Sequence, residues 1–512
     1  MQVLRNRPTA QFKKLRGQNP GVNVFCVRTI TCCLNCVGNS SSLRLKVNQI
    51  IIFFRPANSN GLWCHLLLPA ALVTYSCFDS VPTLYKITSC ISVGLFFHSV
   101  LFIVFLSTSS TVLKEPVYAG CVASGFISTI LLFHPFLFYC LFFSDLGFSL
   151  TVSISSTCLF AAMLRLFIVK FDKTFTLGEA MITAQAVVLF FIMSRMRILL
   201  SLGVLRISTN ITLVFTYFQT ILSTVGLIVT VLYFLTDSWR TLRTLAYIVA
   251  SAAVFVLLIL HAVLGRNCVI TILNYVFVER DRYKLFTFWL FLVLVAVCVL
   301  MVRTRLAVKA STVTRKTFHI LASLVFLSGI LYDVYLMTLA AGIGLGVLIF
   351  VEALRKSGIE PISSALQSAF LVYCDEKDCG LFAMTPLYLY VGLAFPLLLV
   401  PNRPDRELEL LSGVLSIGVG DTAASWFGSR FGFNKWSDSN RTMEGTTFNI
   451  LSQIGTVYAL QLFELLDNKS ALLRTVFAAT VSGFVEAKTD QVDNLVLPLV
   501  TMIALQATWI LL

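Results

Sequence analysis

The chain has 512 residues, of which 57% are hydrophobic and only 12% are charged, and its formal net charge is +14. Soluble globular proteins carry about 25% charged residues, so this composition excludes an ordinary soluble fold and indicates a membrane protein. The positive charge indicates basic loops and contact with anionic lipid headgroups, and no basic–aromatic motif predicts binding to nucleic acid.

Residues 1–46 contain no Asp or Glu and begin with a basic cluster that includes Arg5, Arg7 and Lys13. Transit peptides share this pattern, but we expect a disordered basic tail in the cytoplasm. Cys33 and Cys36 have the spacing of half a zinc site. No second pair follows at a suitable distance, which argues against metal binding there.

Apolar runs close to the length that crosses a bilayer, roughly 20 residues, recur through the rest of the chain. They lack the ten-residue alternation of barrel strands. We therefore predict an all-α, polytopic integral membrane helix bundle with roughly 13 to 15 transmembrane helices. The expected spans lie near residues 62–78, 87–107, 117–143, 147–169, 178–195, 211–235, 245–264, 284–302, 318–332, 334–353, 384–400, 408–429, 446–463, 471–485 and 494–512.

The spans divide into two regions of different character. Residues 47–300 form a hydrophobic multi-span region with few polar motifs, whereas polar and glycine-rich clusters interrupt the spans of residues 301–512. Ionisable groups in apolar surroundings are costly and usually functional, so we expect the second region to be catalytic. The clusters occupy residues 303–319, 352–380, 418–447 and 486–494.

Two expected spans separate each cluster from the next, which predicts that all of them face one compartment. The loops on that side carry twelve Lys and Arg residues, and the loops on the other side carry four. The positive-inside rule then places the clusters in the cytoplasm, where a nucleotide would be found.

Small residues recur every four positions in the third cluster, at Gly420, Ala424, Gly428 and Gly432. On a helix they form a face that permits close packing. A packing seam explains the glycines but not Asp421, because an Asp within a span is costly without a partner. We therefore predict that Asp421 is catalytic and binds a cation.

The loop after this segment combines cations, hydroxyl groups, a carboxylate and a glycine. Its cations can neutralise phosphate oxygens, its hydroxyl groups can donate hydrogen bonds, and its glycine permits close backbone approach. It is not a Walker A loop, and an ordinary solvated loop is the alternative. The predicted phosphate site comprises Lys435, Arg441, Thr442, Gly445 and Thr446, with Glu444 as a catalytic or metal-binding carboxylate.

Near the end of the chain, Glu486, Asp490, Asp493 and Asn494 share one face if a helix runs through them. Like charges at this spacing repel unless cations intervene. The sequence therefore predicts a site for Mg²⁺ or another divalent cation, with a solvated helix end as the alternative.

A further basic motif, residues 315–319, opens a span. Arg315 and Lys316 taken alone would be snorkelling cations at a helix end. His319 lies on the same side of the helix and is a weak candidate for a general base.

Together these clusters resemble the dolichol kinase family. The matching motifs occur in family order at residues 315–319, 375–380, 418–425, 441–445 and 486–498. The resemblance implies transfer of the γ-phosphate of CTP to the hydroxyl of dolichol, to give dolichyl phosphate for protein glycosylation. It also implies a multi-pass protein of the endoplasmic reticulum membrane.

The resemblance further assigns roles to residues. In the family, the proposed CTP-binding loop reads Lys-Lys-Thr-x-Glu-Gly, whereas residues 440–445 here read Asn-Arg-Thr-Met-Glu-Gly, with one cation fewer. Arg315 and Lys316 are expected to join this loop in binding CTP. Asp421 or Asp490 would accept the alcohol proton, and Asp421, Glu486, Asp490 and Asp493 would hold Mg²⁺.

Several alternatives remain open at this stage. Other CTP-dependent lipid kinases, which act on diacylglycerol or phytol, share part of these motifs, and a cytidylyltransferase would form a CDP-lipid instead. A non-catalytic relative is also consistent with the altered basic pair. A transporter would explain many spans and a buried Asp, but the chain shows no internal repeat. The expected partners are dolichol or a related polyprenol and the lipid bilayer, with no protein partner indicated.

Overall fold

The structure is a computed structural model of the chain. It describes residues 44–511, with gaps at 48–49, 79–80, 109–113, 134–145, 172, 204–209, 265–266, 279–281, 307–311, 375–376, 379, 402–405, 438–440 and 467–469. The expected basic tail, residues 1–46, lies outside the described residues apart from its last three, and so does the Cys33–Cys36 pair.

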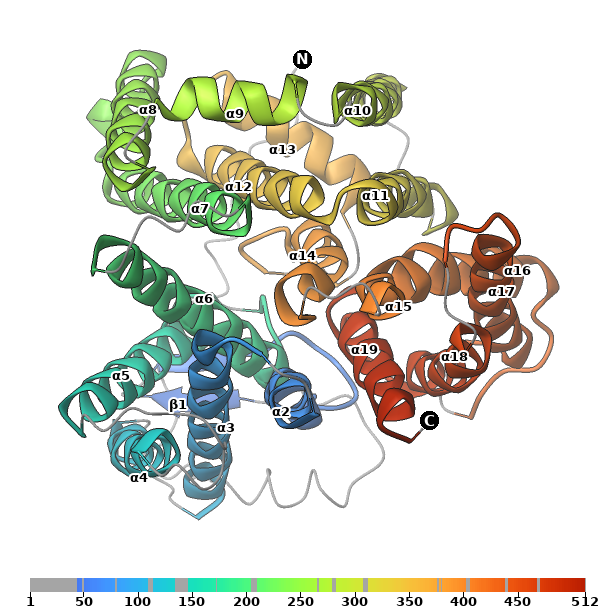
Figure 1. Cartoon of the computed structure of the whole chain (residues 1–512), viewed down its shortest axis with the longest axis horizontal. Coiled ribbons are helices and arrows are strands. Elements are labelled where there is room, and N and C mark those ends of the chain that lie inside the picture. Colours follow the sequence, from blue (N-terminus) through green and yellow to red (C-terminus); the bar gives the residue numbers. More distant parts are fainter. Residues whose placement is uncertain are drawn as a thin grey trace, which may run out of the picture.

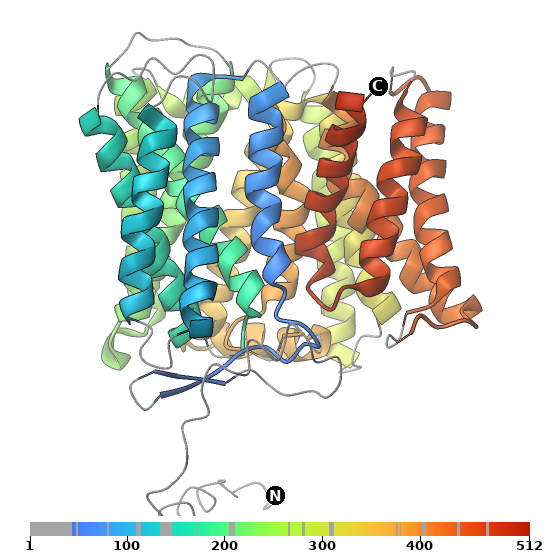
Figure 2. The ribbon, with the colours of Figure 1, turned by 90° about the horizontal axis from the view of Figure 1, so that it is seen from below.

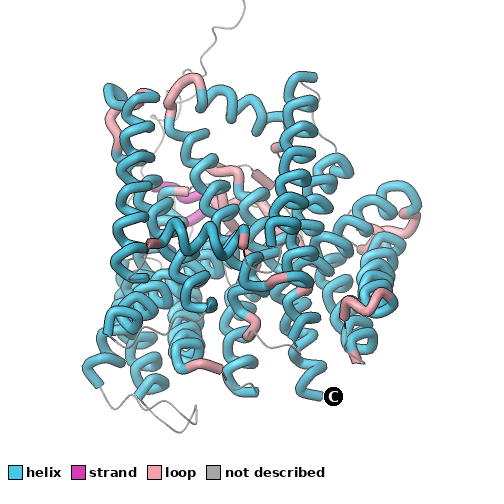
Figure 3. The backbone as a smooth tube through the Cα atoms, turned by 45° about the horizontal axis from the view of Figure 1, so that its top comes forward, coloured by secondary structure: helices cyan, strands magenta, loops and turns pink. Residues whose placement is uncertain are grey.

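Helices make up nearly all of the described chain (Figure 3), which confirms the expected all-α class. Long apolar runs favour this outcome because a helix satisfies every backbone hydrogen bond within one segment. The helical elements are η1 (Leu62–Leu66), α2 (Leu67–Phe78), α3 (Thr83–Thr108), α4 (Lys114–Phe133), α5 (Leu146–Lys170), α6 (Leu177–Gly203), α7 (Asn210–Phe234), η2 (Asp237–Trp239), α8 (Leu242–Leu264), α9 (Cys268–Phe277), α10 (Arg282–Leu306), α11 (Thr312–Tyr332), α12 (Val334–Ser357), α13 (Ile362–Tyr373), α14 (Met384–Leu399), α15 (Glu407–Leu410), η4 (Val414–Asp421), α16 (Thr422–Phe431), α17 (Met443–Leu462), α18 (Ala471–Lys488) and α19 (Asp493–Leu511).

One short hairpin precedes the helices. Strands β1 (Arg44–Val47) and β2 (Ile50–Phe53) pair antiparallel, with Arg44 opposite Phe53. The hairpin lies beyond one end of the helices, on the side where α19 begins, and α19 finishes at the opposite end (Figure 2).

Seven of the described helices are long and apolar enough to cross a membrane. They confirm a polytopic membrane bundle, while the expected total of roughly 13 to 15 spans stays a prediction. Helices α8 and α10 expose large apolar side chains such as Tyr247, Leu258 and Phe291, as expected for surfaces that contact lipid. The seven segments are Thr83–Val104, Leu146–Lys170, Leu177–Arg197, Val214–Phe234, Leu242–Leu264, Arg282–Leu306 and Val334–Ser357.

The helices form three neighbouring groups that follow the chain order (Figure 1). Helices α2–α6 form the first group, α7–α13 the second and α15–α19 the third, with α14 between them. Although α2 and α19 lie at opposite ends of the sequence, they pack against each other. This contact brings the N-terminal region next to the region that carries the polar clusters.

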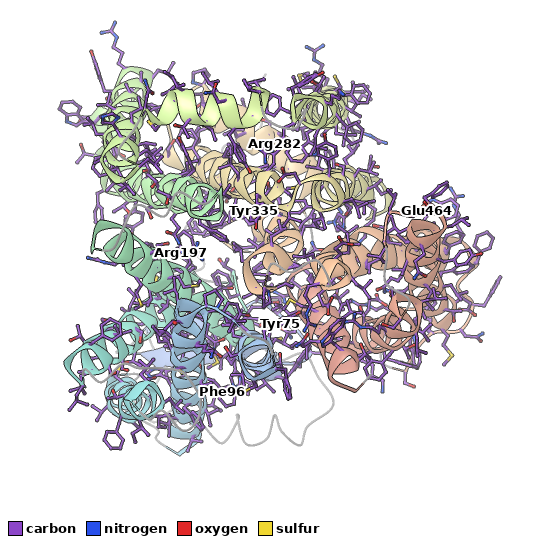
Figure 4. All side chains as sticks on the ribbon, viewed as in Figure 1. Tyr75, Phe96, Arg197, Arg282, Tyr335 and Glu464 are labelled. Atoms are coloured by element: carbon purple, nitrogen blue, oxygen red, sulfur yellow. The ribbon has the colours of Figure 1, made fainter. Side chains whose placement is uncertain are left out.

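Charged side chains inside the bundle are paired. Arg406, Glu409 and Arg474 are fully buried, and both arginines bind Glu409 Oε1, at 3.0 and 2.5 Å. Arg406 Nη1 also donates to Gln506 Oε1 at 2.6 Å. In the α9–α12 part of the bundle, Arg282, labelled in Figure 4, contacts Asp333 at 2.7 Å. Buried charges require such partners, because an unpaired charge in this environment is strongly destabilising.

Element η4 is a π-helix of eight residues that ends at Asp421 and continues directly into α16. A π-helix closes its turns with i→i+5 hydrogen bonds and is frequently found at functional sites. The expected span at 408–429 is therefore built from three helical pieces, α15, η4 and α16.

Candidate functional site

A pocket of about 500 Å³ opens where residues from all four polar clusters come together. This volume is within the usual range for small-molecule sites, about 300–1,000 Å³. The pocket contains four cationic side chains and three carboxylates. Its lining residues are Arg315, Lys316, His319, Lys377, Thr385, Asp421, Ala424, Ser425, Gly428, Ser429, Arg441, Thr442, Gly445, Thr446, Glu486, Val492, Asp493 and Asn494.

The ends of several helices supply these side chains. The first turns of α11, α14, α17 and α19, the junction of η4 with α16, and the last turn of α18 all border the pocket. Helix N-termini carry free N–H groups and partial positive charge, which favours anions at this place.

Asp421 lies on one side of the pocket and is 4% exposed. Its Oδ2 accepts a hydrogen bond from Lys316 Nζ, and His319 Nδ1 lies 3.9 Å from the same oxygen. The sequence predicted that Asp421 binds a cation, and in the structure this cation is Lys316 of α11.

Arg441 connects the other two carboxylates. Its Nη2 contacts both oxygens of Asp493 at 2.9 Å, and its Nη1 lies 3.1 Å from Glu486 Oε1. Lys377 Nζ approaches Asp493 Oδ2 to 3.6 Å. Charge-assisted arginine–carboxylate hydrogen bonds are among the strong ones, so Arg441 fixes the end of α18 relative to the start of α19.

Burial and the neighbouring charges change the pKa of both carboxylates. Burial raises the pKa of Glu486 to about 7, although Arg441 opposes the rise. Burial acts on Asp493 in the same direction, but Arg441 and Lys377 outweigh it and lower the pKa of Asp493. Of these two carboxylates, Asp493 is therefore ionised at neutral pH, whereas Glu486 titrates near neutrality.

The loop before α17 is fixed by its own side chains. Thr442 accepts a hydrogen bond from Gly445 N at 3.1 Å and so caps the helix. The indole of Trp436 donates to Thr446 Oγ1 at 3.0 Å. Glu444 accepts from the backbone N–H groups of Phe433 and Asn434, and these contacts, together with that of its own N–H, lower the pKa of Glu444.

The small-residue face of η4 and α16 packs against α17. A Cβ added at Gly420 would lie 2.6 Å from Asn449 Oδ1, and one at Gly445 would lie 3.1 Å from the carbonyl oxygen of Ala424. A Cβ at Gly428 would meet Thr442 Oγ1 at 3.1 Å. These close approaches set the width of the pocket between α16 and α17.

The pocket brings together most of the site residues predicted from the sequence. These are Arg315, Lys316, Asp421, Arg441, Thr442, Gly445, Thr446, Glu486 and Asp493, with Ala424 and Gly428 from the small-residue face.

The other predicted residues do not border the pocket. Lys435 is exposed, Asp490 is half-buried outside the lining, and Glu444 faces the loop backbone. Gly420 lies at the contact with α17, and Gly432 lies against Thr442.

A single helix does not run from Glu486 to Asn494. Helix α18 ends at Lys488 and α19 begins at Asp493, with residues 489–492 between them. Glu486 and Asp493 nevertheless meet, because Arg441 binds both. The cation that the repelling carboxylates require is thus provided by the protein itself.

The sequence assigned no role to several residues of the pocket, of which Lys377 and Thr385 bear most on its chemistry. Lys377 belongs to the charged turn at 375–380, and Thr385 lies in the first turn of α14. The match of residues 375–380 to the family was the available signal for Lys377, whereas nothing in the sequence marks Thr385. Residues 375–376 and 379 of the same turn lie outside the described residues.

The carboxylates of the pocket are candidate ligands for a metal ion. Within the described part of the chain, no three His, Cys, Asp or Glu side chains are close enough to hold a metal ion by themselves. Three carboxylates still border one pocket together with four cations. This donor set fits Mg²⁺ that arrives with a nucleotide, because Mg²⁺ is commonly bound by one or two carboxylates plus substrate phosphates.

Comparison with known proteins supports a specific family. The family model described as "Dolichol kinase" matches residues 94–387. This stretch includes the basic motif of α11 and Lys377, and it ends before the other polar clusters of the pocket.

Relatives from animals and plants agree with this match. The dolichol kinase of Mus musculus is 33% identical over 265 residues, which cover 48% of this chain and 49% of the relative. That of Bos taurus is 34% identical over the same shares of the two chains. The dolichol kinase EVAN of Arabidopsis thaliana is 30% identical over 45% of this chain and 41% of the relative. The chain thus spans about half the length of the curated relatives it matches, and no solved structure matches it.

Proposed function

The chain belongs to the dolichol kinase family, and from this we propose that it transfers the γ-phosphate of CTP to the hydroxyl of dolichol or a related polyprenol. The observation that carries the proposal is the pocket, where four cations and three carboxylates meet at the ends of apolar helices. A triphosphate requires cations, a divalent ion requires carboxylates, and the helices provide a surface for an isoprenoid chain.

Phosphoryl transfer asks the protein mainly for positioning and for neutralisation of charge. In the proposal, Arg441, Lys316 and Lys377 contact the phosphates, as does Arg315. The N-termini of α17 and α19 add backbone N–H groups. Mg²⁺ bound through Glu486 and Asp493 would neutralise charge on the phosphate oxygens.

Asp421 is proposed to orient the alcohol and to accept its proton, with Lys316 holding the carboxylate in place. The sequence also assigned Asp421 to the metal ion, and either role requires a carboxylate there. Glu444 is proposed to act indirectly by fixing the loop backbone before α17. Lys435 and Asp490 have no contact with the pocket that supports their predicted roles.

We also propose that the protein resides in the endoplasmic reticulum membrane with the pocket open to the cytoplasm. Two observations support this orientation. The polar clusters meet in one pocket, and the loops that carry them hold most of the Lys and Arg residues of the C-terminal region.

The test is phosphate transfer by membranes that contain the full chain. Membranes receive γ-labelled CTP or ATP, and dolichol, diacylglycerol and phytol are offered in parallel. We expect CTP-dependent label on dolichol. Label on another alcohol would change the acceptor, and release of pyrophosphate with formation of a CDP-lipid would indicate a cytidylyltransferase. No labelled lipid from a folded protein would refute the proposal.

Two matched variants accompany this assay. Asp421→Asn should abolish transfer without preventing expression, because it keeps the side-chain shape and removes the charge. Asp237→Asn changes an exposed Asp far from the pocket and should leave transfer unchanged. Full activity of Asp421→Asn would refute the role of this carboxylate.

A further inference from the structure

A second polar cluster lies beside the pocket and is built by the N-terminal part of the chain. Arg55 follows strand β2, and Glu179 lies in the first turn of α6. Arg55 Nη2 contacts Glu179 Oε1 at 2.6 Å, and the two residues are 5% and 0% exposed. A buried ion pair of this kind contributes little net stability, so its position requires another explanation.

Glu179 reaches beyond its arginine to the site. Its Oε1 accepts a hydrogen bond from Val492 N at 3.0 Å, and its Oε2 accepts one from Thr176 N at 3.0 Å. Val492 lines the pocket and directly precedes Asp493. A carboxylate of α6 therefore fixes a backbone amide one residue away from a proposed metal ligand.

Gln491 is bound from the same direction. Its Oε1 accepts from the hydroxyl of Thr176 at 2.6 Å, and its Nε2 donates to the carbonyl oxygen of Ser59 at 3.0 Å. Gly61 has a φ of +63° and leaves the space that this amide fills, since a Cβ there would lie 2.2 Å from Gln491 Oε1. The fit depends on the absence of a side chain at this position.

Lys377 completes the arrangement from the side of the pocket. Its Nζ donates to the carbonyl oxygen of Gln491 at 3.0 Å and approaches Asp493 Oδ2. The short connection between α18 and α19 is thus bound by Glu179, Thr176 and Lys377. Residues 489–492 lie between the two helices, and their backbone is fixed in this way.

We propose that Arg55, Thr176 and Glu179 are positioning residues of the site, which we call the N-terminal clamp. The clamp holds residues 491–493 so that Asp493 meets Arg441 and the incoming nucleotide with its ion. The effect on catalysis rests on the proposed function, but the effect on the backbone does not. Part of the site is therefore organised from the hydrophobic region before residue 300.

Thr176→Val is the central variant because it keeps the size of the side chain and removes the hydroxyl that binds Gln491. Thr176→Ser keeps the hydroxyl and should behave as wild type. Thr88→Val is the matched control, since Thr88 is equally buried (both residues are 2–3% exposed) and its hydroxyl donates to the carbonyl oxygen of Leu84 within α3. Gln491→Glu is a second variant that keeps the acceptor for Thr176 and loses the donor to Ser59.

The first measurement is hydrogen–deuterium exchange of the full chain in detergent micelles, followed by mass spectrometry of peptides that cover residues 489–494. Thr176→Val loses the hydrogen bond to Gln491 and the one that the Thr176 hydroxyl accepts from Glu179 N, so exchange of this segment should speed up by at least about tenfold. Gln491→Glu should also speed it, whereas Thr88→Val and Thr176→Ser should not. Unchanged exchange in both clamp variants would overturn the proposal, whether or not the protein phosphorylates a lipid.

The second measurement is steady-state kinetics with CTP. Thr176→Val should raise KM for CTP roughly three- to tenfold at nearly constant kcat and leave KM for dolichol unchanged. A purely structural role would reduce the amount of active protein, and hence the apparent kcat, without changing KM. Wild-type protein with no transfer to any lipid would refute the proposed function and leave the exchange result as the test of the clamp.

Discussion

Replacing Arg441 separates a role in binding phosphate from a role in holding the site together. Arg441 contacts both carboxylate oxygens of Asp493 through Nη2 and approaches Glu486 through Nη1, and its side chain is 23% exposed. Arg441→Ala therefore leaves two acidic groups with fewer partners. Because Glu486 can bind a proton near neutral pH and Lys377 stays beside Asp493, we expect a loss of roughly 2–4 kcal/mol in the free energy of unfolding.

The expected effect on activity is much larger. An arginine that stabilises a transferring phosphoryl group typically contributes about 10³- to 10⁵-fold to turnover. We expect kcat/KM for CTP to fall by at least a factor of about 10³ in Arg441→Ala. Arg441→Lys should retain part of the activity, because it keeps the charge and loses the planar guanidinium that reaches Asp493 and Glu486 at the same time.

Two further variants make this prediction refutable. Arg441→Ala combined with Asp493→Asn removes the carboxylate left with fewer partners, so it should recover part of the stability but none of the activity. Arg430→Ala is the control, since Arg430 is exposed and stacks on Trp426 outside the pocket. The assays are phosphate transfer and thermal unfolding of the purified protein. An Arg441→Ala enzyme as active as Arg430→Ala would show that Arg441 does not contact the nucleotide.

Other predictions concern close packing, the metal ion and the loop cation. Gly445→Ala should lower both the unfolding temperature and kcat/KM, because the new Cβ would lie 3.1 Å from the carbonyl oxygen of Ala424; Gly455→Ala in the same helix meets nothing within 4 Å and should be neutral in both assays. Chelation of divalent cations should abolish transfer, and Mg²⁺ should restore it; transfer that persists in excess chelator would refute the metal proposal. Lys435→Ala should change kcat/KM for CTP by no more than about threefold, because this side chain is exposed and does not border the pocket. A much larger loss would show that the loop closes over the nucleotide.

The positions of many helices were readily predicted from the sequence. The expected span at 384–400 is α14 (Met384–Leu399), and the expected span at 446–463 is α17 (Met443–Leu462). Long apolar runs between polar residues determine helix ends almost directly. In the bilayer the backbone N–H and C=O groups must bond to each other, and a helix satisfies all of them within one segment. The short helices α9 and α13 were not anticipated, since runs of 10 and 12 residues carry a weaker signal.

Local geometry within the spans was less predictable. The periodicity of small residues suggested a regular helix through Gly420, whereas the structure has a π-helix up to Asp421. Side-chain spacing does not reveal which carbonyl accepts each backbone hydrogen bond. The prediction of one continuous helical face from Glu486 to Asn494 was wrong for a similar reason, because residues 489–492 interrupt the helix.

The sequence predicted which residues line the pocket better than it predicted which of them form ion pairs. Motif residues from four clusters do meet in one pocket, but the sequence did not show that Arg441 would bind both Glu486 and Asp493. The pairing in the N-terminal clamp could not be predicted from the sequence, because Thr176 and Gln491 are 315 residues apart. Glu179, an acid at the start of an apolar run, was the available signal.

The buried cluster of Arg406, Glu409 and Arg474 constrains the order of events during synthesis. Glu409 emerges from the ribosome 65 residues before Arg474, and Arg406 emerges 100 residues before Gln506. A buried charge without its partners is strongly destabilising, and for this cluster that cost lasts until the later helices arrive. The α15–η4 segment therefore reaches its final packing only after α18 and α19 have been made. Substitutions in this cluster should accordingly reduce the yield of assembled protein in cells and leave the turnover of the assembled molecules nearly unchanged.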